Sequence, residues 1–321
     1  VLCPFLGDHY GSVLESGDLE LAFDAEPGEF RVHYYEHRFP LAPETYPGVL
    51  EDGLEVLSAR LGPDDPDLRE LESIITALNH LPERGVTAPE RVEERAKTLV
   101  AEGYRATKWF FRHGPTDGRA GMAANETLVR TLREAVGPDV DIMLDCWMSW
   151  DVPYTLKMAE RLAPYDPRWI EEPVMPDKIE QYAEIRRNTR IPISGGEHEY
   201  TRWGLKALMD AGAVDVLQPD VYWAGGLSEM VKICALASAY DLPVIPHGHS
   251  VPATVHLIAS QPVTTCPLLE YLVKWNAVHQ FFLKDPIEPV GGQVGLPETP
   301  GLGMTLDAAK IESRRDLRFG E

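Results

Sequence analysis

Short β-rich runs alternate with amphipathic helical stretches from about residue 86 to about residue 272, and this alternation constrains the fold more than any other feature. Strands that alternate with helices of about 10–15 residues are typical of βαβ units and a parallel sheet. Seven such strands are legible, and the run 30–37 (FRVHYYEH) is a candidate eighth, placed first. Eight β/α repeats close a barrel, whereas about six also suit an open doubly wound sheet.

The barrel is the fold that we predict. No GxGxxG motif follows an early strand, which counts against the dinucleotide-binding form of the doubly wound sheet. We therefore predict an α/β protein with a modified (β/α) barrel of the TIM type. The predicted strands cover residues 106–111, 141–147, 168–173, 191–197, 214–220, 242–248 and 267–272, and the predicted helices cover 87–102, 124–136, 152–164, 179–189, 202–211, 226–239 and 252–260.

The barrel repeats occupy residues 86–285 and leave a region on either side. Residues 1–85 are rich in Asp, Glu, Pro and Gly and contain one clear helix, 67–81. Residues 286–321 begin with a turn-rich stretch that we expect to pack back on the N-terminal region. We therefore predict a barrel domain with a cap built from the two flanking segments.

Charge and composition exclude several classes of protein. The chain has 30 Lys and Arg against 51 Asp and Glu, a net charge of −21, which repels phosphate backbones and anionic lipids and excludes nucleic acid and membrane partners. The four cysteines lie far apart without a CxxC pair, which excludes a disulfide framework or zinc ribbon. No apolar run approaches 18 residues, and no secretory signal is legible at the start. We expect a soluble, cytoplasmic protein.

An acidic residue or a histidine stands at the end of each of six successive strands. The intervals between these residues are 26, 26, 23, 27 and 23 residues, about the length of one β/α unit. Since parallel strands of a barrel end at the same mouth, these side chains are expected to meet there, where barrel active sites are built. The six residues are Asp145, Glu171, Glu197, Asp220, His247 and Glu270.

The first three of these residues predict a metal site. A single acidic residue at a strand end is more often a helix N-cap or a solvated charge, but three at the same phase repel one another unless a cation holds them. Asp145, Glu171 and Glu197 offer hard oxygen ligands, without a cysteine or a histidine pair, which suits Mg²⁺ rather than zinc.

The next two residues predict a general base. A buried carboxylate at Asp220 beside the imidazole of His247 would fix its tautomer and raise its pKa. His198 directly follows Glu197, and functional and structural interpretations of it are equally open. His249 and His256 are interpreted as structural.

The motifs at these positions resemble the mandelate racemase branch of the enolase superfamily, and most of all its rhamnonate dehydratase group of acid-sugar dehydratases. The resemblance covers about residues 86–310. It is carried by DIMLDCWMSW, WIEEP, ISGGEHE, QPDVYWAGG and IPHGH, and by the closing GLPETPGLGMTLD.

The resemblance implies a capping domain on a modified barrel, a homo-oligomer, Mg²⁺ on the three carboxylates and the His247–Asp220 dyad, with Glu270 near the substrate. Residues 1–85 show no clear match to the capping domain, so they are divergent or truncated there. The branch often carries Lys-x-Lys on the second strand. Here Lys108 is present, but Phe110 stands at the second position, which favours one-base dehydration over racemisation.

The reaction that we expect begins with loss of the C2 proton of a sugar acid, an aldonate such as L-rhamnonate, to His247. Mg²⁺ would stabilise the resulting enediolate. Either His247 or His198 would then protonate the departing 3-hydroxyl, giving a 2-keto-3-deoxy acid. Lys108 would hold the substrate carboxylate, Glu270 would bond the oxyanion or a hydroxyl, and Trp147 would line the pocket.

Three other functions remain open. A racemase, epimerase or cycloisomerase of the same superfamily would use the same metal and base. A barrel glycosidase or other hydrolase would use two of the carboxylates without a metal. A non-catalytic barrel that kept the fold is the third, and five intact polar positions at the mouth count against it.

Overall fold

The computed structural model describes residues 18–22, 31–35 and 89–311. The chain divides into two compact units, residues 1–84 and residues 85–321, and each is described by itself. The predicted helix 67–81 and the predicted helix start at residue 87 lie outside the described residues.

Two strands of the first unit form an antiparallel pair. β1 (Asp18–Ala22) and β2 (Arg31–Tyr35) lie in a two-stranded sheet of their own. The prediction that the run 30–37 is the first strand of the barrel is therefore wrong, although the run does contain a strand. A partner that is near in the sequence costs little loop-closure entropy, and the antiparallel direction does not fit the parallel ladder of a barrel.

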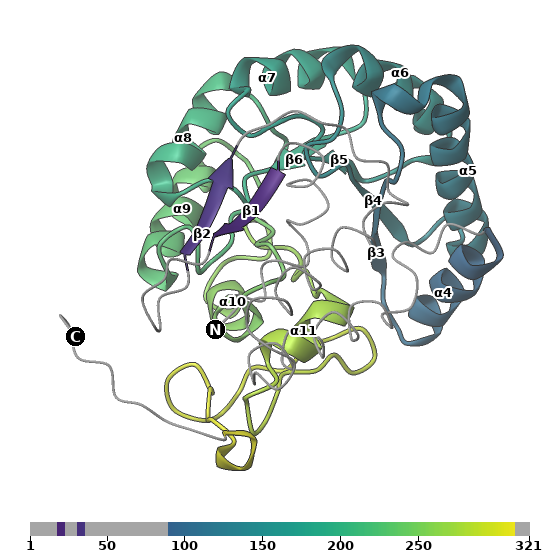
Figure 1. Ribbon diagram of the computed structural model, residues 1–321. Coiled ribbons are helices and arrows are strands. Elements are labelled where there is room, and N and C mark those ends of the chain that lie inside the picture. The colour runs from purple at the N-terminus through teal and green to yellow at the C-terminus, as the bar shows by residue number, and fades with distance from the viewer. Residues whose placement is uncertain (1–17, 23–30, 36–88, 312–321) are drawn as a thin grey trace. The chain divides into compact units, whose positions relative to one another are not determined.

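The second unit alternates strands and helices, and in Figure 1 helices α4 to α9 follow one another around the outside of the strands. The strands are β3 (Ala106–Phe110), β4 (Asp141–Asp145), β5 (Trp169–Glu171), β6 (Ile193–Gly195) and β7 (Val216–Leu217). The helices are α4 (Pro89–Ala101), α5 (Gly118–Val136), α6 (Val152–Leu162), α7 (Ile179–Asn188), α8 (Thr201–Ala211), α9 (Leu227–Ala239), α10 (Val251–Ala259) and α11 (Val273–His279).

All five strands are parallel and pair in sequence order, as a (β/α) barrel requires. Beyond β7 the curve continues through a parallel bridge between Leu217 and Val244, and the Val244 N–H donates to the Thr265 carbonyl at 2.7 Å. The predicted strands 242–248 and 267–272 are not regular strands. Pro243 and Pro246 supply no N–H to a ladder, which accounts for the first.

Local sequence explains where a typical helix of this ring begins and which face it buries. The Asp151 carboxylate caps α6 by accepting a hydrogen bond from the Tyr154 N–H at 2.7 Å, and a proline lies in the first turn. Tyr154, Met158 and Leu162, four residues apart, are buried on one face. α5 begins at Gly118, six residues before the predicted start.

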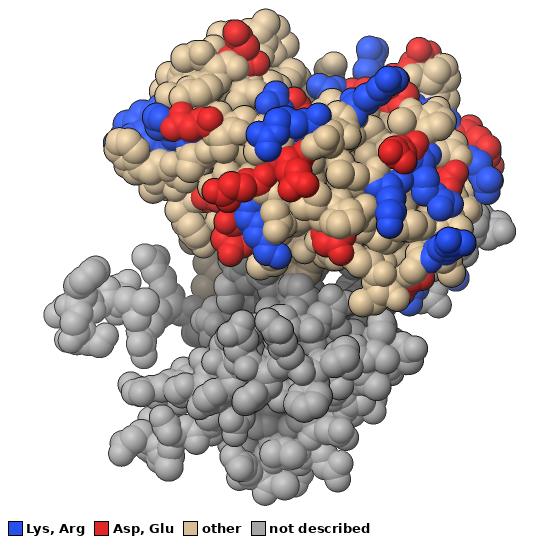
Figure 2. Space-filling model, turned by 90° about the horizontal axis from the view of Figure 1, so that it is seen from above, with Lys and Arg blue, Asp and Glu red and all other residues tan. Residues whose placement is uncertain are grey.

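The outer surface of this unit carries charges of both signs. On the face shown in Figure 2, Lys and Arg side chains are interspersed with Asp and Glu side chains. None of the described helices combines the length and the apolar character needed to cross a lipid bilayer.

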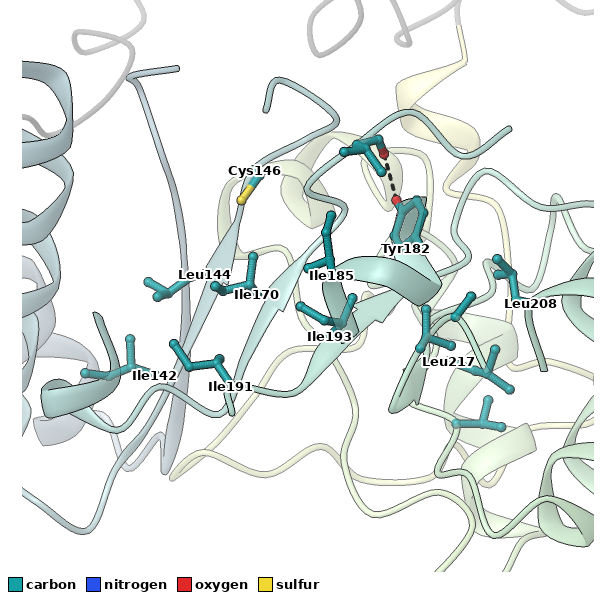
Figure 3. Packing of buried hydrophobic residues seen from close by; sticks show 14 of the residues in the cluster. Ile142, Leu144, Cys146, Ile170, Tyr182, Ile185, Ile191, Ile193, Leu208 and Leu217 are labelled. Carbon is teal, nitrogen blue, oxygen red and sulfur yellow. Dashed lines mark hydrogen bonds between the residues drawn. The ribbon is translucent and has the colours of Figure 1, made fainter. Parts of the chain in front are cut away.

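The strands bury side chains on both faces, and Figure 3 shows part of the cluster on one of them. Those that point towards the helices include Leu144, Ile170, Ile193 and Leu217, each with no exposed surface. A separate cluster of Met143, Trp169, Val216 and Ile245, with Ala106 and Leu268 against it, packs together. Because side chains alternate along a strand, this second cluster marks the barrel interior.

The C-terminal segment lies against the loop between α4 and β3. A Cβ atom added to Gly292 would lie 2.1 Å from the Gly103 carbonyl oxygen, and the φ angles of Gly103 and Gly292 are +95° and +72°. Only glycine accommodates both the close backbone approach and these left-handed conformations. Packing of residues 286–321 on a cap stays a prediction.

Candidate active site and metal centre

The barrel interior carries one polar residue two positions beyond each apolar interior residue. Since the side-chain period of a strand is two, each polar residue lies directly above the apolar cluster, towards the carboxyl ends of the strands. The pairs are Ala106 and Lys108, Met143 and Asp145, Trp169 and Glu171, Val216 and Gln218, Ile245 and His247, and Leu268 and Glu270. This column contains five of the residues predicted for the site, and Gln218, which was not predicted.

Lys108 lies at the centre of three carboxylates. Its ammonium is 2.5 Å from Glu171 Oε1, 2.5 Å from Glu270 Oε1 and 3.1 Å from Asp145 Oδ2. Burial alone would lower the pKa of Lys108, but the three carboxylates outweigh it and raise the pKa well above its ordinary value. Lys108 is therefore a permanent cation at the mouth of the barrel.

Asp145 and Glu171 are each held by donors of the barrel. Asp145 Oδ1 accepts from the Trp147 N–H at 2.9 Å. Glu171 Oε2 accepts from Trp169 Nε1 and from Gln218 Nε2, both at 2.9 Å. Burial, and next the charge of Glu171, raise the pKa of Asp145 well above its ordinary value.

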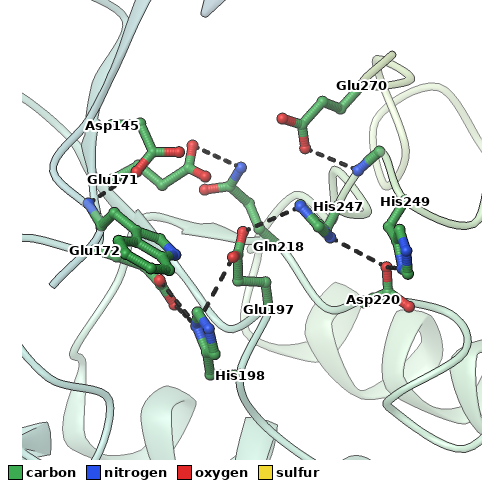
Figure 4. Close-up of polar contacts among 12 residues, drawn as sticks. Asp145, Glu171, Glu172, Glu197, His198, Gln218, Asp220, His247, His249 and Glu270 are labelled. Carbon is green, nitrogen blue, oxygen red and sulfur yellow. Dashed lines mark hydrogen bonds and ion pairs between the residues drawn. The ribbon is translucent and has the colours of Figure 1, made fainter. Parts of the chain in front are cut away.

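Glu197 lies between two histidines (Figure 4). Its Oε2 is 3.5 Å from His247 Nε2, and its Oε1 is 3.8 Å from His198 Nδ1. Burial raises the pKa of Glu197 to about 7, although His247 acts in the opposite direction.

His247 and Asp220, the residues predicted to form a dyad, are in contact, and their role as a general base stays a prediction. His247 Nδ1 is 3.1 Å from Asp220 Oδ2, and the fully buried Asp220 accepts through Oδ1 from the N–H groups of Tyr222 and Trp223 at 2.8 and 3.2 Å. Burial lowers the pKa of His247, but the charge of Glu197 and the hydrogen bond to Asp220 outweigh it and raise the pKa to about 10.

Glu270 fixes the loop that carries the dyad histidine. Its Oε2 accepts from the Gly248 N–H at 3.0 Å, and a Cβ atom on Gly248 would lie 2.9 Å from the Glu270 carbonyl oxygen. Burial raises the pKa of Glu270, but the nearby charges of Lys108 and His247 prevail and lower it. Glu270 is therefore an anion beside His247.

Glu172 belongs to the site and was missed in the sequence analysis. Its buried carboxylate oxygens lie 3.0 and 2.9 Å from His198 Nδ1. A regular strand would turn it to the opposite face from Glu171, but its φ of +39° breaks the alternation. The doubled glutamate of WIEEP was the available signal. Burial lowers the pKa of His198, but its hydrogen bond to Glu172 prevails and raises it.

His249, which the sequence analysis interprets as structural, lies near Asp220 and His247. Its Nδ1 is 3.8 Å from Asp220 Oδ2, and its ring meets His279 edge-on with 3.9 Å between ring centroids. His256 lies within α10, as expected. Phe110 is 58% exposed at the end of β3, with the Lys108 ammonium 5.7 Å from its ring centroid.

The chemistry of the site fits a divalent cation. Among the described residues, Glu172, Glu197 and His198 offer ligand atoms that all lie within 4.8 Å of one another. More broadly, six buried or nearly buried carboxylates lie beside one lysine and three histidines, and carboxylate oxygens are hard donors of the kind that Mg²⁺ prefers. These carboxylates belong to Asp145, Glu171, Glu172, Glu197, Asp220 and Glu270. That Asp145, Glu171 and Glu197 are the ligand set stays a prediction.

Comparison with known proteins identifies a matching family and similar proteins. A family described as "Enolase C-terminal domain-like" matches residues 91–310. An L-rhamnonate dehydratase of Saccharopolyspora erythraea is 41% identical over 224 residues, which are 66% of this chain and 56% of that protein. The chain thus spans just over half the length of that relative.

Two solved structures share the fold. A racemase from Streptomyces coelicolor A3(2) with bound magnesium has a TM-score of 0.61 and 31% identity, covering 71% of this chain and 58% of that one. The 3,6-anhydro-D-galactonate cycloisomerase from Zobellia galactanivorans has a TM-score of 0.62 and 29% identity, covering 83% of this chain and 80% of that one. Both similarities extend over more than two thirds of this chain.

Proposed function

The chain belongs to the enolase C-terminal domain-like family, and from that premise we propose that it is a Mg²⁺-dependent hydro-lyase. The substrate is a sugar acid, an aldonate such as L-rhamnonate, and the product is a 2-keto-3-deoxy acid. The observation that carries the proposal is the His247–Asp220 dyad beside a cluster of buried carboxylates, in a chain 41% identical to an L-rhamnonate dehydratase.

Asp145, Glu171 and Glu197 are the residues that we propose to hold the cation. The close grouping of Glu172, Glu197 and His198 supports the same part of the site, with Glu197 common to both sets. When bound, the cation supplies electrostatic stabilisation for the charge that develops on the substrate carboxylate.

His247 takes the C2 proton at Nε2, because Asp220 engages its Nδ1 and fixes the tautomer. Glu197 contributes most to raising the pKa of His247, so a cation held by the Glu197 carboxylate would offset that contribution. As the C2–H bond breaks, its electron pair is delocalised into the substrate carboxylate. That electron pair then forms the C2–C3 double bond as the C3–O bond breaks. The enol that results gains a proton at C3 and becomes the 2-keto acid.

The departing 3-hydroxyl takes a proton from His247 or from His198, and leaves as water. Lys108 holds the substrate carboxylate, and Glu270 accepts a hydrogen bond from a hydroxyl group. Trp147, whose backbone N–H holds Asp145, lines the pocket.

An epimerase, racemase or cycloisomerase is the second candidate, since the two solved structures reported above carry such names. Racemisation needs proton exchange on both faces of C2. Phe110 at the position of a second base supports dehydration instead.

The test is to incubate the full chain with Mg²⁺ and a panel of aldonic and aldaric acids that includes L-rhamnonate, with a chelated control. Formation of a 2-keto-3-deoxy acid only with Mg²⁺ is the expected result. Solvent deuterium at C2 of recovered acid, without loss of water, would select the second candidate. Chelator-insensitive turnover would contradict both.

A further inference from the structure

In the side-chain amide of Gln218, the NH₂ group donates a hydrogen bond, whereas the carbonyl oxygen has no partner among the described residues. Gln218 is 1% exposed and follows β7, one of the strands that line the barrel interior. Its Nε2 donates to Glu171 Oε2 at 2.9 Å (Figure 4). Its Oε1 is buried and has no hydrogen-bond partner among the residues that the structure describes. A buried carbonyl oxygen left without a donor is unfavourable, so it points to a missing hydrogen-bond donor.

The orientation of this amide follows from its surroundings. An ionised carboxylate only accepts hydrogen bonds, so the NH₂ group of Gln218 must face Glu171 and the oxygen must face away from it. Gln218 stands two residues beyond Val216 of the apolar interior cluster, in the same column as Glu171 and His247. The acceptor is thus presented inside the polar end of the barrel.

Glu171 is left with one oxygen for a cation. Trp169 and Gln218 both donate to its Oε2, whereas its Oε1 is the atom that meets the positive charge of Lys108 at 2.5 Å. Two donors on one oxygen fix the rotation of the carboxylate, in the way that outer-shell partners orient metal ligands.

We propose that Gln218 is a positioning residue of the metal centre with a second task. Its NH₂ group holds Glu171 so that Oε1 faces the cation, and its carbonyl oxygen accepts a hydrogen bond from an O–H group bound at that cation. That group is either a water molecule or a hydroxyl of the substrate. The inference rests on the proposed function for the presence of the cation.

The first experiment measures Mg²⁺ affinity by calorimetry on the full chain without substrate. Gln218→Met removes both halves of the amide at similar length, and Gln218→Asn withdraws the amide by one methylene group. Both are expected to weaken Mg²⁺ binding about 10- to 100-fold. Gln261→Met, on an exposed glutamine bonded to Ser260, is the matched control and is expected to bind like the wild type.

Trp169→Phe separates the two tasks, because it removes the other donor to Glu171 and leaves the Gln218 oxygen in place. If water is the O–H source, Gln218→Met weakens Mg²⁺ binding more than Trp169→Phe does. If a substrate hydroxyl is the source, Gln218→Met raises KM for L-rhamnonate more than Trp169→Phe does, at equal Mg²⁺ saturation.

Folded Gln218→Met and Gln218→Asn variants with wild-type Mg²⁺ affinity and wild-type KM would overturn the inference. A wild-type chain that does not bind Mg²⁺ would overturn it as well. A wild type that binds Mg²⁺ but dehydrates no acid, with weaker binding in the Gln218 variants, would leave the inference standing and remove the proposed function.

Discussion

At the scale of single residues, two carboxylate–histidine pairs flank Glu197 but present different atoms to it. His247 gives Nδ1 to Asp220 and turns Nε2 towards Glu197. His198 instead directs Nδ1 towards both Glu172 and Glu197. His247 therefore has one ring nitrogen fixed by a carboxylate and the other directed towards Glu197, which is the arrangement of a general base.

Replacing His247 by Asn is expected to lower turnover by at least 10²–10⁴-fold, because general-base catalysis contributes about that much. Mg²⁺ affinity should persist, since none of Asp145, Glu171 and Glu197 is replaced. The measurements are C2 proton exchange in deuterated solvent, followed by NMR, and Mg²⁺ calorimetry. His256→Asn within α10 is the control, and near-wild-type exchange in His247→Asn would refute the role of base.

The β/α repeat brought several residues of this cluster together in the prediction, and its limits are physical. Intervals of about one β/α unit between strand ends predicted that Asp145, Glu171 and His247 would lie at one mouth. Glu172 escaped because its left-handed backbone breaks the period of two, and such a conformation is not legible from a non-glycine residue. Gln218 was not predicted because its side chain is neutral, and only charged residues and histidines were considered at the strand ends. It lies two residues before Asp220, so the side-chain period of two would have placed both on the same face.

At the scale of elements, α8 and α9 are joined by one buried acidic side chain. Glu229, near the start of α9, accepts from the Arg202 N–H at 3.0 Å and from its guanidinium at 2.6 and 2.8 Å. Lys232 lies 3.1 Å away. The backbone hydrogen bond from Arg202, with Lys232 beside it, lowers the pKa of Glu229 to about 2.

Glu229→Gln is expected to lower the unfolding temperature at pH 7, and this destabilising effect should become smaller as the pH falls. The folded pKa of about 2 lies below the ordinary value of 4.5, so this stabilisation is complete above about pH 4.5 and is lost as the pH falls towards 2. The difference in unfolding temperature between wild type and variant should therefore narrow between pH 5 and pH 3.

The control is Glu93→Gln, which breaks an exposed i,i+4 pair with Lys97 on α4 and should change the unfolding temperature less. Calorimetric scans at several pH values test both variants. A difference that stays constant from pH 7 to pH 3 would show that Glu229 does not titrate as argued.

Most helices and five strands of the barrel could be predicted from periodicity. The elements that were predicted wrongly or not at all have local causes. Residues 242–248 are apolar, but their prolines cannot extend a ladder. α11 was not predicted, because seven residues give too short a window for a helical period. The antiparallel pairing of β2 depends on β1, whose short run DLELA gives no turn signal of its own.

At the scale of the whole molecule, negative charge is in excess both overall and within the site. The net charge is −21, and charges of both signs mix on the face in Figure 2. Any salt that screens self-repulsion therefore stabilises the chain somewhat, whereas a divalent cation bound among the buried carboxylates adds a specific effect.

Mg²⁺ is expected to raise the unfolding temperature more than NaCl at equal ionic strength. A ligand at about 100 times its Kd stabilises the folded state by about 2.7 kcal/mol. Glu197→Gln should remove most of the Mg²⁺ effect and leave the NaCl effect intact. Thermal scans with EDTA, NaCl and MgCl₂ compare the three conditions, and an unchanged response to Mg²⁺ in Glu197→Gln would exclude that carboxylate as a ligand.

The six pairs of a polar residue above an apolar residue in the barrel interior separate the reactive side chains from the packing that supports them. Met143, Trp169, Val216 and Ile245 supply the packing, and the side chains two residues further on supply the reactivity. A single codon change at a strand tip thus alters one chemical property and leaves the foundation beneath it intact. Such a frame would let new activities arise one strand end at a time, on an unchanged apolar layer.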